Sequence, residues 1–438
     1  KNITVFFLKN RFVINNETIG YCMNTFSKRA GSIILMIPAL SAAFILAHFL
    51  RSAPALIAPD LRMDLGLTPG QLSSLPAAIF LGAALMQLPV GVLLDRFGPR
   101  LSMFSFMNVA AIGTLVFAYA DNIFYLRMGL FLIGCGAAPV FMGVIVLLSR
   151  WVARDRLSTA TAISVAVGGV GMLLSSSPFA LAVDSYGWRI SLQVVGFTTF
   201  FVAFSLLFFI KDRPEQDQII SEVETLSEVI LGLKYILTDK RIYYFAAVTA
   251  ISFGTLITIR NLWIGPYLND IYHLDTIERG QIIFFVSVAW IISALVYGPL
   301  DRLFDTRSGV VTGGLLLFAL MTMLLALNYS PSVTVVTILL VLFSLTAAMA
   351  GPIFAHARSL FSDKYSGRVF TAINLCTWSG IFLLQVLTGT ILNFFSVDEL
   401  GRSPDIAYRI MFATLSFSLV LVAVIYRKVK DVPPSSDN

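Results

Sequence analysis

The stretch Gly91-Val92-Leu93-Leu94-Asp95-Arg96-Phe97-Gly98-Pro99-Arg100 lies between two long apolar runs. A charged residue at the centre of a bilayer costs about 2.5–3.5 kcal/mol on insertion scales, so its acid and two arginines are expected at the membrane surface. Gly98-Pro99 supplies a tight turn, and Gly91 allows two helices to approach closely. The stretch therefore predicts two membrane-spanning helices joined by a short charged turn.

The composition of the whole chain supports this interpretation. Of its 438 residues, 57% are hydrophobic and 13% are charged, whereas soluble proteins carry about 25% charged residues. Apolar runs of about 20 residues, separated by short charged loops, predict about twelve membrane-spanning helices. The fold class expected is an all-α membrane protein, with the lipid bilayer as its surroundings.

The net charge of +6 follows from this topology. Most of the 31 Lys and Arg residues fall in segments on one side of the predicted membrane, together with both ends of the chain. Such an excess marks the cytoplasmic side, so both termini are expected in the cytoplasm. The excess of Lys and Arg over Asp and Glu therefore reflects the membrane topology, and no nucleic-acid partner is predicted.

Charge and apolarity divide the chain into five segments. We expect an N-terminal cytoplasmic tail, two six-helix halves joined by a cytoplasmic linker, and a disordered C-terminal cytoplasmic tail. Apolar residues at helical spacing predict an amphipathic helix in the linker. The bounds of the five segments, in chain order, are 1–31, 32–210, 211–241, 242–427 and 428–438.

The two halves repeat each other in sequence. Arg51 in the first predicted span corresponds to Arg260 in the seventh. Gly70-Gln71 likewise corresponds to Gly280-Gln281, and each pair follows the arginine of its own half at a similar distance. The stretch Gly298-Pro299-Leu300-Asp301-Arg302-Leu303-Phe304-Asp305-Thr306-Arg307 repeats the opening stretch, although its acid moves by one position. Parallel halves of this kind are a plan of secondary transporters, whose sites lie between the halves near the midplane.

The pattern G-x-x-x-D-R-x-G-x-R of the opening stretch resembles the loop between helices 2 and 3 of the major facilitator superfamily (MFS) of secondary transporters. The resemblance covers about 33–427 and implies twelve helices in two pseudo-symmetric halves, acting as a monomer. The sequence departs from the family in the fourth helix, where Leu130 replaces a frequent arginine and Arg127 lies nearly one turn earlier. The antiporter signature of the fifth helix is absent after Pro178, which disfavours drug–proton exchange.

The same resemblance implies a cytoplasmic latch, in which the family's acid pairs with cations and helix ends of the other half. A generic turn on the cytoplasmic side is the alternative, although it would need only the arginines. The residues expected to form the latch are Gly91, Asp95, Arg96, Gly98 and Arg100, their repeats Asp301, Arg302 and Arg307, and the partners Arg150, Arg154 and Arg368.

Arg51 and Arg260 each lie well inside an apolar span. A guanidinium stays charged and offers a planar fork to carboxylate or phosphate. In the superfamily, helices 1 and 7 face each other across the central cavity, so the resemblance implies that both arginines bind the anionic substrate, as in organophosphate and nitrate transporters. The alternative is that each side chain reaches the outer interface or caps backbone carbonyls beside nearby prolines.

His48 precedes Arg51 by three residues and shares its helix face. No Asp or Glu lies inside a predicted span, so the usual intramembrane proton carriers are missing. A bound anion would favour the charged imidazole, which makes His48 a candidate for coupling transport to a proton. A counter-anion is the alternative coupling ion, and a packing histidine is the alternative role.

Aromatic and amide side chains on the predicted spans suit the neutral part of an organic substrate. Each is also a candidate for packing or for a hydrogen bond between helices. The residues concerned are Asn261, Tyr297, Asn374 and Trp378, together with Gln87, Trp263 and Gln385.

No catalytic constellation stands out, the sequence has no phosphate-cradling loop for ATP, and its three cysteines lack metal-ligand spacing. We therefore expect no enzyme, no cofactor and no metal. The function expected is secondary active transport, such as symport, of a small organic anion (a carboxylate or an organophosphate) across a bacterial inner membrane by rocker-switch alternating access. One alternative is an MFS transporter of zwitterionic or neutral solutes such as amino acids, peptides or drugs. Another is a non-transporting receptor or scaffold.

Overall fold

The computed structural model describes residues 16–152, 157–212, 231, 234, 236, 238–329, 332–361 and 366–437. Within these ranges the chain is helical and contains no strand. The first group of helices comprises α1 (Asn16–Leu65), α2 (Pro69–Ala118), α3 (Ile123–Trp151), α4 (Leu157–Leu174) and α5 (Ser177–Phe209). The second comprises α7 (Lys240–Thr258), the π-helix η2 (Ile259–Trp263), α8 (Ile264–Tyr272), α9 (Thr276–Leu303), α10 (Arg307–Leu327), α11 (Val333–Leu345), α12 (Ala350–Leu360), α13 (Ser366–Asn393), α14 (Asp405–Tyr426) and the 3-10 helix η4 (Pro434–Asp437).

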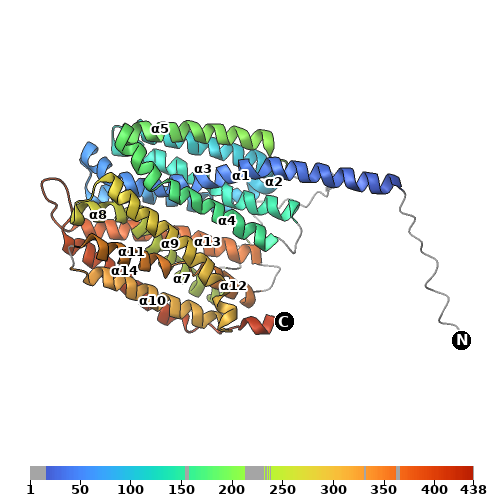
Figure 1. Ribbon diagram of the computed structural model, residues 1–438. Coiled ribbons are helices and arrows are strands. Elements are labelled where there is room, and N and C mark those ends of the chain that lie inside the picture. The colour runs from blue at the N-terminus through green and yellow to red at the C-terminus, as the bar shows by residue number, and fades with distance from the viewer. Residues whose placement is uncertain are drawn as a thin grey trace.

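The two groups form two neighbouring bundles, which we call the first and second half (Figure 1). Contacts between the halves run from α1 to η2 and α8, from α2 to α13, and from α5 to α9. We call the end of the molecule that carries the C-terminus the terminal end, and the end that carries α8 the far end (Figure 1). The excess of basic loops predicts that the terminal end is cytoplasmic.

Eleven segments of the described chain are long and apolar enough to cross a membrane. Two of them come from α2, namely Pro69–Leu94 and Arg96–Ala118, and Gly98, where φ is 78° and ψ is 160°, lies near the start of the second. The segment Ala166–Phe209 has 44 residues, about 66 Å if helical throughout, whereas a membrane core is about 30 Å thick. Gly187 interrupts it with φ 78° and ψ 159°, nearly the conformation of Gly98. The structure thus gives eleven such segments where the sequence predicts twelve spans, and a division of this segment at Gly187 would account for the difference.

The second span of each half begins with the same local device. Thr68 and Gln71 form a capping box at the start of α2, and Asp275 and Glu278 form one at the start of α9. Each box satisfies two backbone N–H groups that a helix start would otherwise leave free. The repeat found in the sequence is thus also a repeat of local structure.

The buried apolar side chains form two clusters. The larger one includes residues of both halves, such as Leu56 on α1 and Tyr267 on α8. The smaller one belongs to the first half alone and includes Met36, Trp151 and Ile210, at the terminal end of its helices. The apolar core therefore joins the halves toward the far end.

The described part of the N-terminal segment is helical, whereas residues 1–15 lie outside the described ranges. Residues 16–31 continue α1 as one helix of 50 residues, about 75 Å long, which extends past the bundles (Figure 1). The amphipathic helix expected in the linker falls mostly on residues 213–230, outside the described ranges.

The C-terminal tail is docked, contrary to the expectation of disorder. The carboxylate of Asp431 accepts hydrogen bonds from the Thr306 hydroxyl and from the backbone N–H groups of Arg307 and Ser308, at 2.5, 3.1 and 2.9 Å. A carboxylate stabilises a helix start because the first N–H groups have no partner within the helix. The tail therefore caps α10 and is held by that contact.

The first half contains the same arrangement. Asp212 follows the last helix of its half, as Asp431 follows α14, and its carboxylate accepts a hydrogen bond from the backbone N–H of Arg100 at 2.7 Å. In each half, an aspartate after the last span thus caps the helix that starts beyond the charged stretch.

Candidate functional site

Arg51 and Arg260 are both buried, with exposed fractions of 9% and 3%. Arg51 on α1 donates from Nη2 to the backbone carbonyl of Ala137 on α3, at 2.9 Å. It thus caps a carbonyl, as one alternative expected, but on a neighbouring helix. His48 lies one helical turn before Arg51 on the same face of α1, and its ring packs against Phe44 with ring centroids 4.9 Å apart.

Arg260 and Asn261 lie on η2, a single π-helical segment between α7 and α8. A π-turn accommodates an extra residue and changes the direction of the side chains that follow it, and it is frequent at functional sites. The Asn261 Nδ2 atom donates to the backbone carbonyl of Arg51 at 3.1 Å. The π-turn thereby contacts the first half directly beside its buried arginine.

Each guanidinium lies over an indole ring of the second half. The Cζ atom of Arg51 is 5.2 Å from the ring centroid of Trp378 on α13, and that of Arg260 is 5.7 Å from Trp290 on α9. At distances within about 6 Å, an aromatic ring attracts a cation. Trp378 also stacks on Phe80 of α2, with ring centroids 5.9 Å apart. The residues that we call the arginine cluster are His48, Arg51, Arg260, Asn261, Trp290 and Trp378.

The two charges of the cluster have no acidic partner in the part of the chain that the structure describes. The ion pairs found there involve other residues, and the Nε atoms of Arg51 and Arg260 are both buried without a hydrogen-bond partner. A buried charge without a partner costs several kcal/mol. A bound anion would remove this cost, so the cluster is suited to attract one.

Two other predicted substrate contacts differ in their surroundings. Asn374 is half-buried on α13, one helical turn before Trp378 on the same face. Tyr297 on α9 donates instead to the backbone carbonyl of Thr346, at 3.2 Å. That hydrogen bond stays within the second half and gives Tyr297 a structural partner.

The remaining amide and aromatic candidates are all buried. Trp263 donates from its indole nitrogen to the hydroxyl of Thr388 at 2.8 Å, also within the second half. Gln385 on α13 is fully buried, and within the part of the chain that the structure describes neither of its amide atoms has a hydrogen-bond partner. Gln87 lies on α2 with an exposed fraction of 8%.

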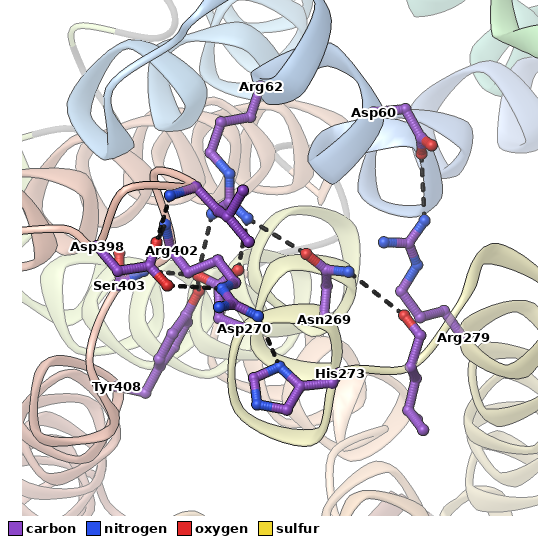
Figure 2. A network of polar contacts seen from close by, with 12 residues as sticks. Asp60, Arg62, Asn269, Asp270, His273, Arg279, Asp398, Arg402, Ser403 and Tyr408 are labelled. Atoms are coloured by element: carbon purple, nitrogen blue, oxygen red, sulfur yellow. Dashed lines mark hydrogen bonds and ion pairs between the residues drawn. The ribbon is translucent and has the colours of Figure 1, made fainter.

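Two ion pairs join the halves at the far end (Figure 2). Arg62 on α1 donates to both carboxylate oxygens of Asp270 on α8, at 2.6 and 3.0 Å. Arg279 near the start of α9 donates to Asp60 on α1, at 3.2 Å. Each half contributes one acid and one base, so the attraction acts in both directions across the interface.

Asp270 lies near the end of the candidate span Lys240–Tyr272, with an exposed fraction of 5%. Its Oδ2 atom also accepts hydrogen bonds from the backbone N–H of Ser403 at 2.9 Å and from the hydroxyl of Tyr408 at 2.8 Å (Figure 2). A carboxylate tolerates burial when donors and a cation replace the lost water. These contacts supply that replacement.

Close backbone packing accompanies the ion pairs. A Cβ atom on Gly265 of α8 would lie 1.9 Å from the carbonyl oxygen of Ala55 on α1. A Cβ atom on Gly280 of α9 would lie 2.5 Å from the Cβ atom of Ala180 on α5. Both contacts cross between the halves, so the far end is closed in this structure.

The predicted latch residues of the first half contact that same half. Arg100 donates from Nε to the carbonyl of Leu207 at 2.7 Å, and Arg150 donates to the carbonyl of Asp212 at 3.3 Å. Gly98 makes the predicted turn. Arg96 is exposed and lies over the ring of the adjacent Phe97, and nothing lies within 4 Å of a Cβ atom built on Gly91, so the close approach expected there is not found.

The repeated stretch in the second half behaves alike. Arg307 is 3.9 Å from Asp301, whose carboxylate accepts a hydrogen bond from the backbone N–H of Arg302. Arg307 also donates to the carbonyl of Val432 in the docked tail. Contacts across the halves therefore stay a prediction for another conformation. The side chains of three further predicted latch residues lie outside the described part of the chain, namely those of Asp95, Arg154 and Arg368.

A family profile described as Major Facilitator Superfamily matches residues 40–383 and 264–438. The chain belongs to this superfamily. The family and the fold are those of membrane transporters, and the protein is a multi-pass membrane protein of the MFS type.

Relatives of this MFS chain include transporters named for anions. The chain is 22% identical over 401 residues to the hexuronate transporter of Bacillus subtilis (strain 168), covering 86% of this chain and 90% of that protein. It is 22% identical over 313 residues to the probable nitrate transporter NarT of Staphylococcus epidermidis, covering 70% and 76%. It is 24% identical over 290 residues to the uncharacterized transporter YybO of Bacillus subtilis, a match that spans 63% of this chain and 62% of YybO.

Solved structures agree with the MFS fold. A bacterial homologue of the human lysosomal transporter Spinster, in an inward-facing and unoccupied conformation, matches with a TM-score of 0.72 and 16% identity over 90% of this chain and 96% of that one. The nucleoside transporter NupG matches with a TM-score of 0.70 and 13% identity over 91% and 99%. At these identities the likeness concerns the fold alone, and it confirms the predicted fold class.

The far-end ion pairs and Trp290 are absent from the sequence-based prediction. A signal for one pair exists in the repeat, because Arg62 follows Arg51 by eleven residues and Asp270 follows Arg260 by ten. Opposite charges thus occupy nearly equivalent positions of the two halves. No comparable signal marks Trp290, which is one aromatic residue among many on the spans.

Proposed function

We propose that the protein is a secondary active transporter that moves a small organic anion, a carboxylate or an organophosphate, across a bacterial inner membrane. The observation that carries this proposal is the buried pair Arg51 and Arg260, one from each half, without an acidic partner among the described residues. Planar guanidinium groups form paired hydrogen bonds with carboxylate or phosphate oxygens. An anion held between the two would also link the halves through the substrate.

The aromatic rings of the cluster favour an organic anion. Trp378, Phe80 and Trp290 place apolar ring surface next to the two charges. Ligand sites typically combine such surface with a few polar groups that fix orientation. The names of the related hexuronate and nitrate transporters support an anionic substrate in general.

The contacts between the halves support a proposal of alternating access. With both termini in the cytoplasm, the closed far end faces the outside, and the site would communicate with the cytoplasm in this conformation. Opening the far end requires the pairs Arg62–Asp270 and Asp60–Arg279 to separate. The charged stretch Gly91–Arg100 and its partners would then latch the cytoplasmic side, which completes a rocker-switch cycle within a monomer.

Coupling is proposed for His48, which lies one helical turn before Arg51 on the same face of α1, so that the arginine charge repels an imidazolium there. The negative charge of a bound anion would offset that repulsion and favour the imidazolium. Substrate and proton would then travel together as a symport. Exchange against a counter-anion is the other form of coupling, and it would leave transport independent of the proton gradient.

The test is ligand-induced stabilisation of the purified protein. Carboxylates, organic phosphates, inorganic anions, amino acids, sugars and cations are compared by thermal unfolding. A ligand at a hundredfold excess over its Kd stabilises by about 2.7 kcal/mol. One class of organic anion should stabilise the wild-type protein and should not stabilise the variants Arg51→Gln and Arg260→Gln. The matched control is Arg127→Gln, because Arg127 is an exposed arginine on α3 whose Nε donates to Ser74.

Two outcomes would contradict the proposal. Stabilisation only by neutral or cationic solutes would make the buried arginines structural. Undiminished stabilisation of both arginine variants by the anion would place its site elsewhere. Uptake into proteoliposomes, with and without a pH gradient, then distinguishes symport from exchange.

A further inference from the structure

The arginine cluster contains more unsatisfied hydrogen-bonding groups than an anion alone requires. Besides the Nε atoms of both arginines, the Oδ1 atom of Asn261 and the indole nitrogen of Trp290 are buried without a hydrogen-bond partner among the described residues. Most buried polar atoms in folded proteins have a partner, so such a group calls for an explanation. One explanation is a substrate that supplies the missing hydrogen-bond partners.

The orientation of the Asn261 amide is fixed by its own hydrogen bond. Its Nδ2 atom donates to the carbonyl of Arg51 at 3.1 Å, and the reverse orientation would place two acceptor oxygens against each other. Oδ1 is therefore an acceptor that needs a donor. Nitrate and a fully ionised carboxylate have acceptors only, so neither can satisfy it.

Trp290 offers the opposite chemistry. Its indole N–H can only donate a hydrogen bond. The centroid of its ring lies 5.7 Å from the Cζ atom of Arg260, the residue that precedes Asn261 in the chain. One buried acceptor and one buried donor in addition to two cations match a substrate that has hydroxyl groups as well as a negative charge. A hydroxyl both donates and accepts, which suits both groups.

We propose that the arginine cluster selects a hydroxy-carboxylate, whose hydroxyl groups donate to Asn261 Oδ1 and accept from the Trp290 indole N–H. This inference rests on the proposed function, because it adds selectivity to the same anion site. Arg51 and Arg260 bind the carboxylate, whereas Asn261 and Trp290 are specificity-determining residues that distinguish hydroxylated from plain acids.

The size of the expected selectivity follows from the cost of an unpaired group. Leaving a buried donor or acceptor without a partner costs about 1–3 kcal/mol. Because about 1.4 kcal/mol corresponds to a tenfold change in Kd, a plain acid should bind roughly ten- to a hundredfold more weakly than its hydroxylated counterpart.

The experiment is isothermal titration of the full chain in detergent with paired probes. Tartrate and malate are compared with succinate, gluconate is compared with hexanoate, and nitrate serves as a donor-free anion. The hydroxylated member of at least one pair should bind at least tenfold more tightly, and nitrate should bind weakly. Equal affinity within both pairs, or tighter binding of nitrate, would overturn the inference while leaving the anion site intact. No binding of any of these anions would instead count against the proposed function itself.

Trp290→Phe tests the assignment to one atom, because it removes the indole N–H and keeps an aromatic face over Arg260. This variant should reduce severalfold the ratio between the Kd of the plain acid and the Kd of its hydroxylated counterpart. It should change the Kd of the plain acid little. The matched change Trp188→Phe also removes one indole N–H, which donates to Asp64 at 2.8 Å within the first half and outside the arginine cluster. It should leave the ratio unchanged. An equal loss of ratio in both variants, or none in Trp290→Phe, would overturn the role of Trp290.

Discussion

Arg62 on the first half donates to both carboxylate oxygens of Asp270 on the second, at 2.6 and 3.0 Å. Both side chains are almost fully buried, at 4% and 0% exposure. A pair of this kind contributes little compared with apolar packing, yet it is costly to break on one side only, because the remaining charge loses its partner. The pair therefore acts as a specific lock between the halves rather than as general stabilisation.

Asp270→Asn should release this lock. The amide oxygen can still accept from Ser403 and Tyr408, but Arg62 loses its counter-charge, at a cost of about 3–5 kcal/mol to the closed far end. A cysteine at position 55, which is buried under α8, should then react at least about tenfold faster with maleimide. The rate is measured in a background without the native cysteines.

The matched control for that experiment is Asp64→Asn. Asp64 pairs with Arg189 at 2.7 Å within the first half, and both side chains are more than a third exposed. Exposed pairs contribute about 0–1 kcal/mol, so the labelling rate should stay near that of the parent. Equal rates in both variants would show that Arg62–Asp270 does not close the far end.

Gly265→Ala should be incompatible with the closed far end. Its Cβ atom would meet the carbonyl oxygen of Ala55 at 1.9 Å, so α1 and α8 would have to separate. We expect faster labelling at position 55 and transport at least about tenfold slower, because a clash of this kind costs more than about 1.4 kcal/mol. Gly313→Ala on α10 is the control, since nothing lies within 4 Å of its Cβ position and it should be neutral or slightly stabilising.

Asp431→Asn should weaken the cap on α10. Losing a capping carboxylate costs about 0.5–2 kcal/mol, which thermal unfolding detects as a lower Tm. Asp121→Asn is the control, because Asp121 is an exposed residue that accepts a hydrogen bond only from the neighbouring Asn122. An unchanged Tm for Asp431→Asn would mean that the docked tail contributes nothing to stability.

The same residue predicts a pH dependence. Partial burial alone would raise the pKa of Asp431, but hydrogen bonds from Ser308, Thr306 and Arg307 outweigh it and hold the pKa below its ordinary value. The stabilisation of the folded state by the ionised Asp431 carboxylate is therefore complete above about pH 4, and it is lost as the pH falls through the lowered pKa. The Tm difference between wild type and Asp431→Asn should be constant from neutral pH to about pH 5 and shrink below about pH 4.

Asp95→Asn should slow turnover without changing the affinity of the site for its anion. Asp95 belongs to the predicted cytoplasmic latch and lies far along α2 from the arginine cluster, so the anion should bind with unchanged Kd. Turnover in proteoliposomes should fall severalfold, because the conformation closed at the terminal end loses an ion pair worth about 1 kcal/mol or more. A changed Kd with normal turnover would contradict the role of Asp95.

The fold could be predicted from the sequence because membrane spans are marked by length and apolarity, and the repeat around Arg51 and Arg260 marked the two halves. The two arginines were identifiable because a charge inside an apolar run is rare. Trp290 was not identifiable, since the π-turn at Ile259–Trp263 changes the direction of Arg260 and helical periodicity assumes regular turns.

The far-end lock could not be derived from local pattern either. Arg62 and Asp270 are separated by 208 residues, and their contact depends on how the two halves dock. The docked tail escaped prediction for a related reason. Its composition is that of a disordered segment, yet a single carboxylate at Asp431 finds three donors at the start of α10.

The docked C-terminus has a practical consequence for labelling this protein. Asp431 binds at the start of α10, and four residues later Ser435 donates from its hydroxyl to the carboxylate of Asp305. A fluorescent reporter that replaces residues from 431 onward would leave the start of α10 without its carboxylate and lower the yield of folded protein. A reporter or affinity tag should therefore be attached beyond this docked segment through a flexible glycine–serine spacer, which keeps the capping residue in place.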